Sequence, residues 1–571
     1  GFRIYERKCV NGEDTIELSE EFRQEVEKYS GLGVLYGLYR ADPWADKDYE
    51  TGLAGVLSKK AYNQVQRYVL EHSRLGIPVM MSSECPHGHQ ALDGYLLPVN
   101  LLAGATFDPA MVRAAYRVSG RQLQNMGVDF ALMSMLDVLR DPRWGRSEEC
   151  YSEDPYLSAR MAEAAVIGMQ ESGPEGVAKH FAAQGEGTGG VNASAARIGE
   201  RELREIHFPP AAAAIKAGAK GIMAAYNEID GVYCHANRWL LNDVIRKEMG
   251  FDGIVMSDGV AIDQLDSMTG DNVMSGALAL QSGVDVGLWD EAFGKLEEAV
   301  RRGLVKEAQI DQAVLTLKFE RGLFEHPYLE EEGEIHMDYA QNPESVQLAR
   351  EGLVILQNKN QGLPFWENQA SGKKIAVVGP NADDLYNQLG DYTHPLRRDD
   401  GITVLDGMKL IFKESDIRFS QGCYLRKRDE NLLKEAVDTV KNSDIVICVL
   451  GGSSSRFGGA SFDTNGAALL DNAAADDKGT LMDCGEGMDC SDLELPDAQL
   501  ELLKALKETG KTVIAVVICG RPLVLTQVCE LADGVILGFY PGPRGGQAIA
   551  EVISGRVAPS GRLPVSLPRS T

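Results

Sequence analysis

The stretch at residues 250–259 (GFDGIVMSDG) ends a short apolar run in two polar groups. Gly250 and Gly253 mark its entry, and residues 254–256 form the continuous apolar run typical of a parallel strand covered on both faces. Asp258 follows at the carboxyl end of this strand, where α/β enzymes place reactive side chains. We therefore predict that Asp258 is a nucleophile; the alternative is a carboxylate that only caps the following helix.

A second candidate carboxylate is Glu486, which lies in a long segment, residues 451–492, rich in Gly, Ser, Asp and Ala. Long loops without regular structure are uncommon in compact domains and are often functional. Gly485 and Gly487 flank Glu486, so the backbone is free to turn sharply and to carry the carboxylate outward. The alternative is a solvated surface glutamate.

Short apolar runs alternate with helical patterns over residues 30–290, which predicts βαβ units and a parallel sheet. The predicted strands are 33–38, 77–82, 130–135, 176–180, 221–226, 253–257 and 283–288. Seven or eight such units fit a (β/α)8 TIM-like barrel. Polar groups end nearly every run and should meet at one mouth: Glu84 with His87, Asp137, Lys179 with His180, Tyr226 with Asn227, Asp258 and Asp285. A buried lysine without a partner is costly, so Lys179 argues against helix caps alone.

A second α/β unit is predicted after a polar segment. We expect the barrel to span residues 1–325, a linker to span 326–371 with one helix near 345–356, and an αβα sandwich to span 372–571. The predicted strands of the sandwich are 374–378, 445–450, 512–519 and 534–539. The segment KIAVVGPNADD at residues 374–384 lacks GxGxxG, so no nucleotide cofactor is predicted.

Composition narrows the class of partner. The 571 residues carry a formal net charge of −27, which disfavours nucleic acid and anionic membranes and suits small neutral substrates. No run of about 18 apolar residues occurs, so no membrane span is predicted. The ten cysteines show no zinc spacing, and no metal is predicted. Scattered cysteines favour a reducing cytoplasmic setting; a secreted or periplasmic location stays open because the chain begins at Gly1, and so does a homodimer.

Several motifs in order resemble glycoside hydrolase family 3, the exo-acting β-glucosidases and β-xylosidases, over nearly the whole chain. The motifs are RDPRWGR at 140–146, SEDPY at 152–156, KHF at 179–181, ELRE at 202–205, MAAYN at 223–227, the stretch at 250–258, GEGMD at 485–489, LELP at 493–496 and PSGRLPV at 559–565. The resemblance implies a TIM-like barrel plus an αβα sandwich, an active site between them, and retention of anomeric configuration. Asp258 falls on the family nucleophile, and Glu486 falls on the acid/base of members with a Gly-Glu-Gly-x-Asp loop.

The resemblance also implies a set of substrate-binding residues: Glu84, Arg146, Lys179, His180, Tyr226 and Arg197. Glu84 would accept hydrogen bonds from hydroxyls of the non-reducing end, which favours exo action, and Tyr226 would hydrogen-bond the nucleophile. One departure is Gly259, where many members have Trp or Tyr after the nucleophile. We therefore expect a more open wall there, with any aromatic supplied from elsewhere. Many members continue into a fibronectin-III-like domain after a similar ending, so a further domain stays open.

The leading hypothesis is a retaining β-glycosidase that releases terminal β-D-glucosyl residues. A β-xylosidase, or an enzyme with dual glucosidase, xylosidase or arabinosidase activity, is the near alternative. Two other classes stay open: a Schiff-base aldolase with Lys179 as the nucleophilic amine, and a carbohydrate-binding protein without catalytic activity. Retaining hydrolysis needs two carboxyls about 5–5.5 Å apart across the scissile bond, which is the arrangement expected of Asp258 and Glu486.

Overall fold

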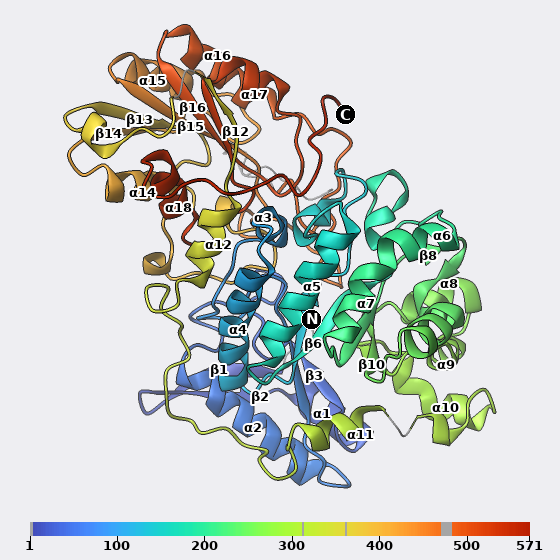
Figure 1. Cartoon of the computed structure of the whole chain (residues 1–571). Coiled ribbons are helices and arrows are strands. Elements are labelled where there is room, and N and C mark those ends of the chain that lie inside the picture. Colours follow the sequence, from blue (N-terminus) through green and yellow to red (C-terminus); the bar gives the residue numbers. More distant parts are fainter. Residues whose placement is uncertain (1–3, 311–312, 360–361, 470–481) are drawn as a thin grey trace.

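The computed structural model describes residues 4–310, 313–359, 362–469 and 482–571. The chain forms two lobes, with the N-terminal sheet in one and the C-terminal sheet in the other (Figure 1). The predicted barrel, linker and long loop each include positions outside the described residues, namely 1–3 and 311–312, 360–361, and 470–481.

The first lobe is built on a parallel sheet of seven described strands in the order β11-β10-β7-β6-β5-β4-β3. In chain order the strands are β3 Val34–Tyr36, β4 Met80–Glu84, β5 Phe130–Ser134, β6 Glu175–Phe181, β7 Gly221–Ala224, β10 Ile254–Gly259 and β11 Val286–Leu288. Every predicted strand of this region overlaps an observed one. The sheet interior is filled by apolar side chains such as Met80, Leu132 and Met256.

The seven-stranded sheet curls into a nearly closed barrel. The ring of Tyr36, in edge strand β3, packs on Trp289, directly after edge strand β11, with centroids 4.7 Å apart. The two edges therefore converge through side chains, although no ladder pairs β3 with β11 among the described residues. The predicted fold class is confirmed, with seven described strands where a (β/α)8 barrel has eight.

Helices of the first lobe lie on its outside (Figure 1). They are α2 Val56–His72, α4 Pro109–Asn125, α5 Pro155–Gln170, α7 Phe208–Lys216 and α9 Asn272–Ser282. Two of them begin with an Asp-Pro pair, in which the carboxylate caps the first turn and proline stands at the first helical position. Asp154 accepts from Tyr156 N at 2.8 Å, and Asp108 accepts from Ala110 N and Met111 N.

The second lobe holds a six-stranded sheet in the order β12-β17-β16-β15-β13-β14. The strands are β12 Val354–Asn358, β13 Lys374–Val378, β14 Asp416–Ser420, β15 Ile445–Gly451, β16 Thr512–Ile518 and β17 Gly534–Leu537. Contacts pair α14 Val404–Ile411 with α18 Gly545–Ile553 and α15 Glu430–Lys441 with α16 Asp497–Glu508, so helices cover the sheet as two groups. This is the predicted sandwich.

Several elements differ from the sequence expectation. The pattern predicts one helix over residues 345–356, but α12 ends at Gly352 and β12 follows, antiparallel to β17. The apolar run after Gly352 supplies an edge strand because its side chains pack into the second core. The hairpin of β1 Tyr5–Val10 and β2 Glu13–Leu18, and strand β14, are not predicted by the sequence pattern. No helix among the described residues is long and apolar enough to cross a membrane.

Candidate active site

The strand ends bring the predicted polar side chains together at the mouth of the barrel. Glu84 ends β4, Lys179 and His180 lie in the last three residues of β6, and Asp258 lies near the end of β10. Tyr226 follows β7 by two residues. All five side chains are buried, so polar groups at these positions need partners or a ligand.

One carboxylate oxygen of Asp258 is held and the other is not. Oδ1 accepts from Gly259 N at 2.8 Å, whereas Oδ2 is buried without a hydrogen-bond partner among the described residues. Nε2 of His180 lies 3.7 Å from this Oδ2 and is also buried without a hydrogen-bond partner in the described part of the chain. The other nitrogen of that ring, Nδ1, lies 2.7 Å from Asp137 Oδ2, which fixes the ring's orientation. Two orphaned polar atoms thus face one space, as expected of a site that a polar ligand completes.

Burial is the largest influence on the pKa values of Asp258, Asp137 and His180. It raises the pKa of Asp258 to about 7, with the charge of Glu486 adding to the rise and Arg146 and Lys179 opposing it. Burial also raises the pKa of Asp137 to about 7 and holds the pKa of His180 well below its usual range. His180 is therefore neutral, and the proton on Asp258 is lost only near neutral pH.

The raised pKa of Asp258 gives a testable pH dependence. An attacking carboxylate must be ionised, and the ionised fraction falls as the pH drops below about 7. We expect kcat/KM to decline about tenfold per pH unit on the acidic side, with an apparent pKa near 7 rather than near that of an ordinary aspartate. A pH profile of kcat/KM on an aryl glycoside measures it. A plateau that extends down to about pH 5 would contradict the raised pKa of Asp258.

Glu486 reaches the barrel because its loop is seated on the segment around Gly145. Gly485 N donates to Gly145 O at 2.8 Å, and both oxygens of Asp489 accept backbone N–H groups of the barrel lobe, from Gly145 and Asn192, at 2.7 Å each. A Cβ on Gly145 would lie 2.2 Å from Gly485 O. Residue 145 must therefore be glycine for the loop to approach this closely.

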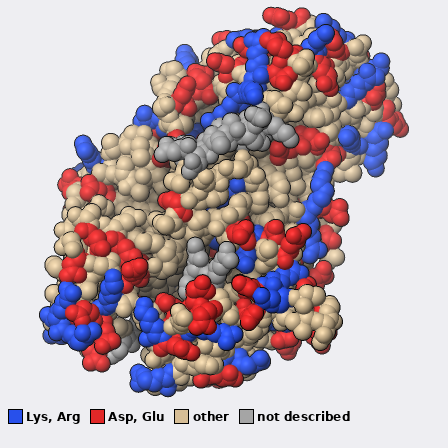
Figure 2. All heavy atoms as spheres, turned by 180° about the vertical axis from the view of Figure 1, so that it is seen from behind, with Lys and Arg blue, Asp and Glu red and all other residues tan. Residues whose placement is uncertain are grey.

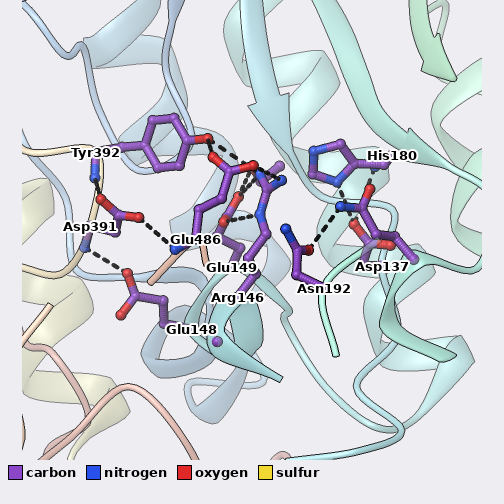
Figure 3. A network of polar contacts seen from close by, with 12 residues as sticks. Asp137, Arg146, Glu148, Glu149, His180, Asn192, Asp391, Tyr392 and Glu486 are labelled. Atoms are coloured by element: carbon purple, nitrogen blue, oxygen red, sulfur yellow. Dashed lines mark hydrogen bonds and ion pairs between the residues drawn. The ribbon is translucent and has the colours of Figure 1, made fainter. Parts of the chain in front are cut away.

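Both carboxylate oxygens of Glu486 carry donors. Arg146 Nη1 donates to Oε1 at 3.0 Å, and the Tyr392 hydroxyl donates to Oε2 at 2.6 Å (Figure 3). Arg146 is itself oriented by Glu149, which accepts from Nε at 2.6 Å and from Nη2 at 2.9 Å. Arg146 is fully buried, so this planar fork fixes Glu486 against the barrel.

Asp258 and Glu486 share one electrostatic environment although they come from different lobes. The charge of Glu486 raises the pKa of Asp258. After burial, the charges of Asp258 and then Glu486 raise the pKa of Tyr226. Arg146 bonds Glu486 directly and also opposes the raised pKa of Asp258. The two predicted acids therefore lie close enough for the charge of one to influence the titration of the other.

The remaining predicted contacts divide into a buried group and an exposed residue. Lys179 Nζ donates to Glu84 Oε2 at 2.9 Å, and the Tyr36 hydroxyl donates to Glu84 Oε1 at 3.1 Å. The Tyr226 hydroxyl donates at 2.9 Å to the carbonyl of Gly259, the residue after Asp258, and the nearby Asp258 carboxylate helps to raise the pKa of Tyr226. Arg197 is exposed and stands outside the buried network. Its predicted contact with substrate stays a prediction.

An open space is expected beside Gly259, but the ring of Trp289, which follows another strand, fills it. A Cβ on Gly259 would lie 2.8 Å from the indole of Trp289, which follows β11. Trp289 has φ of 48°, a left-handed conformation unusual for a bulky residue, and its ring also approaches Trp44 at 6.1 Å. The aromatic that the sequence lacks after Asp258 is thus present in space, supplied by Trp289, and Gly259 makes room for it.

Sequence reasoning missed Asp391 and Tyr392, which lie in the loop after β13. Tyr392 contacts Glu486, and four cations lie within 6 Å of its ring centre: Arg40, Arg146, Lys179 and Arg456. The Asp391 carboxylate accepts from Glu486 N at 2.9 Å, from Tyr392 N at 2.7 Å and from the Arg456 guanidinium. A signal existed in the polar GDYTH at residues 390–394, but nothing in its spacing indicated contact with Glu486.

Removal of the Asp391 carboxylate should destabilise the protein. Asp391 and Arg456 are both buried, so Asp391→Ala removes the nearest carboxylate of Arg456, leaves among the described residues only the more distant Asp42, at 3.7 Å, and should cost about 3–5 kcal/mol. The midpoint of urea unfolding should fall clearly. The matched control is Asp243→Ala, because Asp243 pairs with Lys247 on the surface and such exposed pairs contribute little to stability. Equal midpoints for the two variants would contradict this role of Asp391.

Charge is unevenly distributed over the surface. Charged side chains of both signs cover the two lobes, whereas the waist between them is mainly uncharged on the face seen from behind (Figure 2). Within the described ranges no group of three or more His, Cys, Asp or Glu side chains could hold a metal ion. A buried pair of acids, surrounded by further polar groups that can exchange hydrogen bonds, suits hydrolysis of a hydroxyl-rich substrate.

The barrel, the loop of the second lobe that carries Glu486, and the two buried acids together are typical of a glycoside hydrolase. A model for the glycosyl hydrolase family 3 N terminal domain matches residues 49–318, and one for the C-terminal domain of that family matches residues 353–571. The chain belongs to glycosyl hydrolase family 3.

Individual proteins to which the chain is similar are also β-glycosidases. The chain is 32% identical to a β-xylosidase of Formosa agariphila, over 93% of this chain and 74% of that protein. It is 32% identical to a periplasmic β-glucosidase of Salmonella typhimurium, over 92% of this chain and 69% of that protein. Among solved structures, a β-glucosidase from Erythrobacter marinus gives a TM-score of 0.84 at 31% identity, covering 96% of this chain and 74% of that one. A β-glucosidase from Listeria innocua in complex with isofagomine gives 0.81 at 27% identity, covering 97% and 71%.

Proposed function

We propose that the protein is a retaining exo-β-glycosidase that releases terminal, non-reducing β-D-glucosyl residues. The observation that carries the proposal is the orphaned Oδ2 of Asp258, buried 3.7 Å from Nε2 of His180 and in the electrostatic field of Glu486. A sugar bound there would place its anomeric carbon at the free carboxylate oxygen. Its hydroxyls would complete the polar atoms left without partners in the described part of the site.

The proposed reaction has two steps. Ionised Asp258 attacks the anomeric carbon with Oδ2, while Glu486 in its protonated form gives its proton to the leaving glycosidic oxygen, so the C–O bond breaks and a glycosyl ester forms. Glu486, now a carboxylate, then takes a proton from a water molecule that attacks the same carbon and releases Asp258. Asp137 and His180 hold the geometry around Oδ2, since the imidazole is neutral and anchored at Nδ1.

The other buried groups support recognition of a chain end. Glu84 has one oxygen bonded to Lys179 and the other to Tyr36, and such a carboxylate can accept hydrogen bonds from hydroxyl groups of the terminal sugar. The same pairing disfavours the aldolase alternative. A Schiff base needs a neutral amine, and Lys179 donates to Glu84 as a buried ion pair.

A panel of 4-nitrophenyl glycosides tests the substrate. We expect the highest kcat/KM on the β-glucoside, lower rates on the β-xyloside and α-arabinoside, and none on the N-acetyl-β-glucosaminide. A β-xylosidase is the second candidate, since a relative carries that name. Preference for the β-xyloside would select that candidate, and turnover of none of the four glycosides would overturn the proposed function.

We further propose a reducing, cytoplasmic setting. All ten cysteines are free in the structure, and most of them are buried. Fractionation of the source cells tests the location, and recovery of the protein with periplasmic markers would contradict it. Whether the protein forms a homodimer is a separate question that light scattering answers.

A further inference from the structure

Two of the five tryptophans are more than one third exposed, and both are seated in the same way. Trp289, at the active-site mouth, is 38% exposed, and Trp366, in the second lobe, is 48% exposed. Each indole lies so close to a glycine that a Cβ there would displace the ring. A Cβ on Gly259 would lie 2.8 Å from the ring of Trp289, and a Cβ on Gly555 would lie 2.6 Å from the ring of Trp366. Both glycines therefore leave room for an indole that stays partly open to solvent.

Trp366 forms part of a shallow hollow of about 530 Å³ that is separate from the catalytic residues. Its lining consists of Trp366, Glu367, Asn368, Gln369, Ser554, Gly555 and Arg556. The lining comes from the start of α13 Glu367–Ala370 and the segment after α18. Within the described chain, none of these residues belongs to the network around Asp258 and Glu486. Trp366 precedes α13, and its ring lies against Gly555, so about half of the side chain stays open to a ligand.

The polar groups of the hollow are fixed and mutually neutralised. Arg556 Nε donates to Glu367 Oε1 at 2.5 Å, and Nη2 donates to Oε2 at 2.8 Å, so the two side chains form a bidentate pair. These two are the charged residues of the lining, and their charges cancel. Asn368 and Gln369 add exposed amides, each with donors and an acceptor. An anion or a cation would have to compete with the existing pair, whereas a neutral hydroxylated ligand would not.

We propose that this hollow, hereafter the Trp366 site, binds a neutral β-linked saccharide chain outside the active site. A β-D-glucopyranosyl or β-D-xylopyranosyl ring carries its hydrogens axially, so each ring face is apolar and can lie on an indole. Its equatorial hydroxyls point sideways, where the Arg556–Glu367 fork and the two amides can exchange hydrogen bonds with them. The choice of β-linked chains rests on the proposed function; the Trp366 site itself does not. It would hold a polymer near the enzyme while single residues are removed from chain ends.

Affinity electrophoresis tests this proposal. Native gels containing soluble mixed-linkage β-glucan or soluble xylan would be run with the full chain carrying Asp258→Asn, so that the polymer is not degraded. We expect at least one polymer to retard the protein. Trp366→Ala in the same background should weaken the apparent affinity at least about 10-fold, the usual loss when a central aromatic is removed. Tyr328→Ala is the matched control, because Tyr328 is 45% exposed and lies outside the hollow; it should leave retardation unchanged.

The test of the Trp366 site and the test of the proposed function can fail separately. With Asp258 intact, Trp366→Ala should keep the hydrolysis rate on 4-nitrophenyl β-glucoside, which shows that the variant folds and that its active site is undisturbed. No retardation by either polymer would overturn the Trp366 site, and so would retardation that survives Trp366→Ala or is lost equally with Tyr328→Ala. Failure of the proposed function would appear instead as no turnover of any 4-nitrophenyl glycoside by the protein with its native Asp258.

Discussion

Asp258→Asn should reduce turnover of an aryl β-glucoside by at least about 10⁴-fold, because the substitution removes the attacking oxygen while keeping the shape of the side chain. The geometry gives the reason. Oδ2 of Asp258 has no hydrogen-bond partner among the described residues. In Asp258→Asn, the amide nitrogen or oxygen would take the place of Oδ2. Neither atom forms a stable ester with the anomeric carbon. Steady-state rates on 4-nitrophenyl β-glucoside measure the loss.

Binding of a competitive sugar analogue is the control for this prediction. A side chain of the same size should leave the hydrogen bond from Asp258 N to His235 Nε2 in place, so the pocket should stay intact. A competitive sugar analogue should therefore still bind Asp258→Asn within about 10-fold of the native affinity. A variant that keeps more than a tenth of native turnover would show that Asp258 is not the nucleophile.

Glu486→Ala should show a loss that depends on the leaving group. A general acid contributes about 10²–10⁴-fold, and it matters most when the departing oxygen is strongly basic. We expect a large fall in kcat/KM for an alkyl or unsubstituted phenyl glucoside and a small fall for a dinitrophenyl glucoside. The second step also slows, because no carboxylate remains to deprotonate water.

Rescue of the rate by azide distinguishes a catalytic role of Glu486 from a structural one. Azide is an anion that needs no base, so it should attack the glycosyl ester in the space left by the Glu486 side chain. The rate on the dinitrophenyl glucoside should rise with added azide, and the product should be the β-glucosyl azide. A uniform loss across leaving groups, without rescue, would mean that Glu486 only holds Arg146 and Tyr392 in place.

The sequence allowed prediction of the elements that follow a regular period. Asp258 could be placed at a strand end because residues 254–256 form a clean apolar run, and the observed strand β10 spans Ile254–Gly259. Lys179 stood out because its burial required a partner, which the structure supplies in Glu84. β12 was missed because a helix runs directly into an edge strand there, and the two patterns merge.

The parts of the site that lie in loops could not be predicted in the same way. Asp391 bonds Arg456 and Glu486, which are 65 and 95 positions away in the chain, and no local period encodes such contacts. Glu486 itself was found from its flanking glycines and from the family resemblance. Trp289 shows the same limit, since its ring fills the space beside Gly259 although it follows a different strand. Contacts between loops depend on the whole fold, not on local pattern.

The most direct test of the central claim is to trap the covalent intermediate. An activated 2-deoxy-2-fluoro-β-D-glucoside forms the glycosyl ester but slows its hydrolysis, so the modified protein should accumulate. Mass spectrometry of the intact chain, and then of its peptides, should place one fluoroglucosyl group on Asp258. The label should be absent from Asp258→Asn. A label on Lys179 or on another carboxylate, or inactivation without any added mass, would contradict the role of Asp258 as the nucleophile.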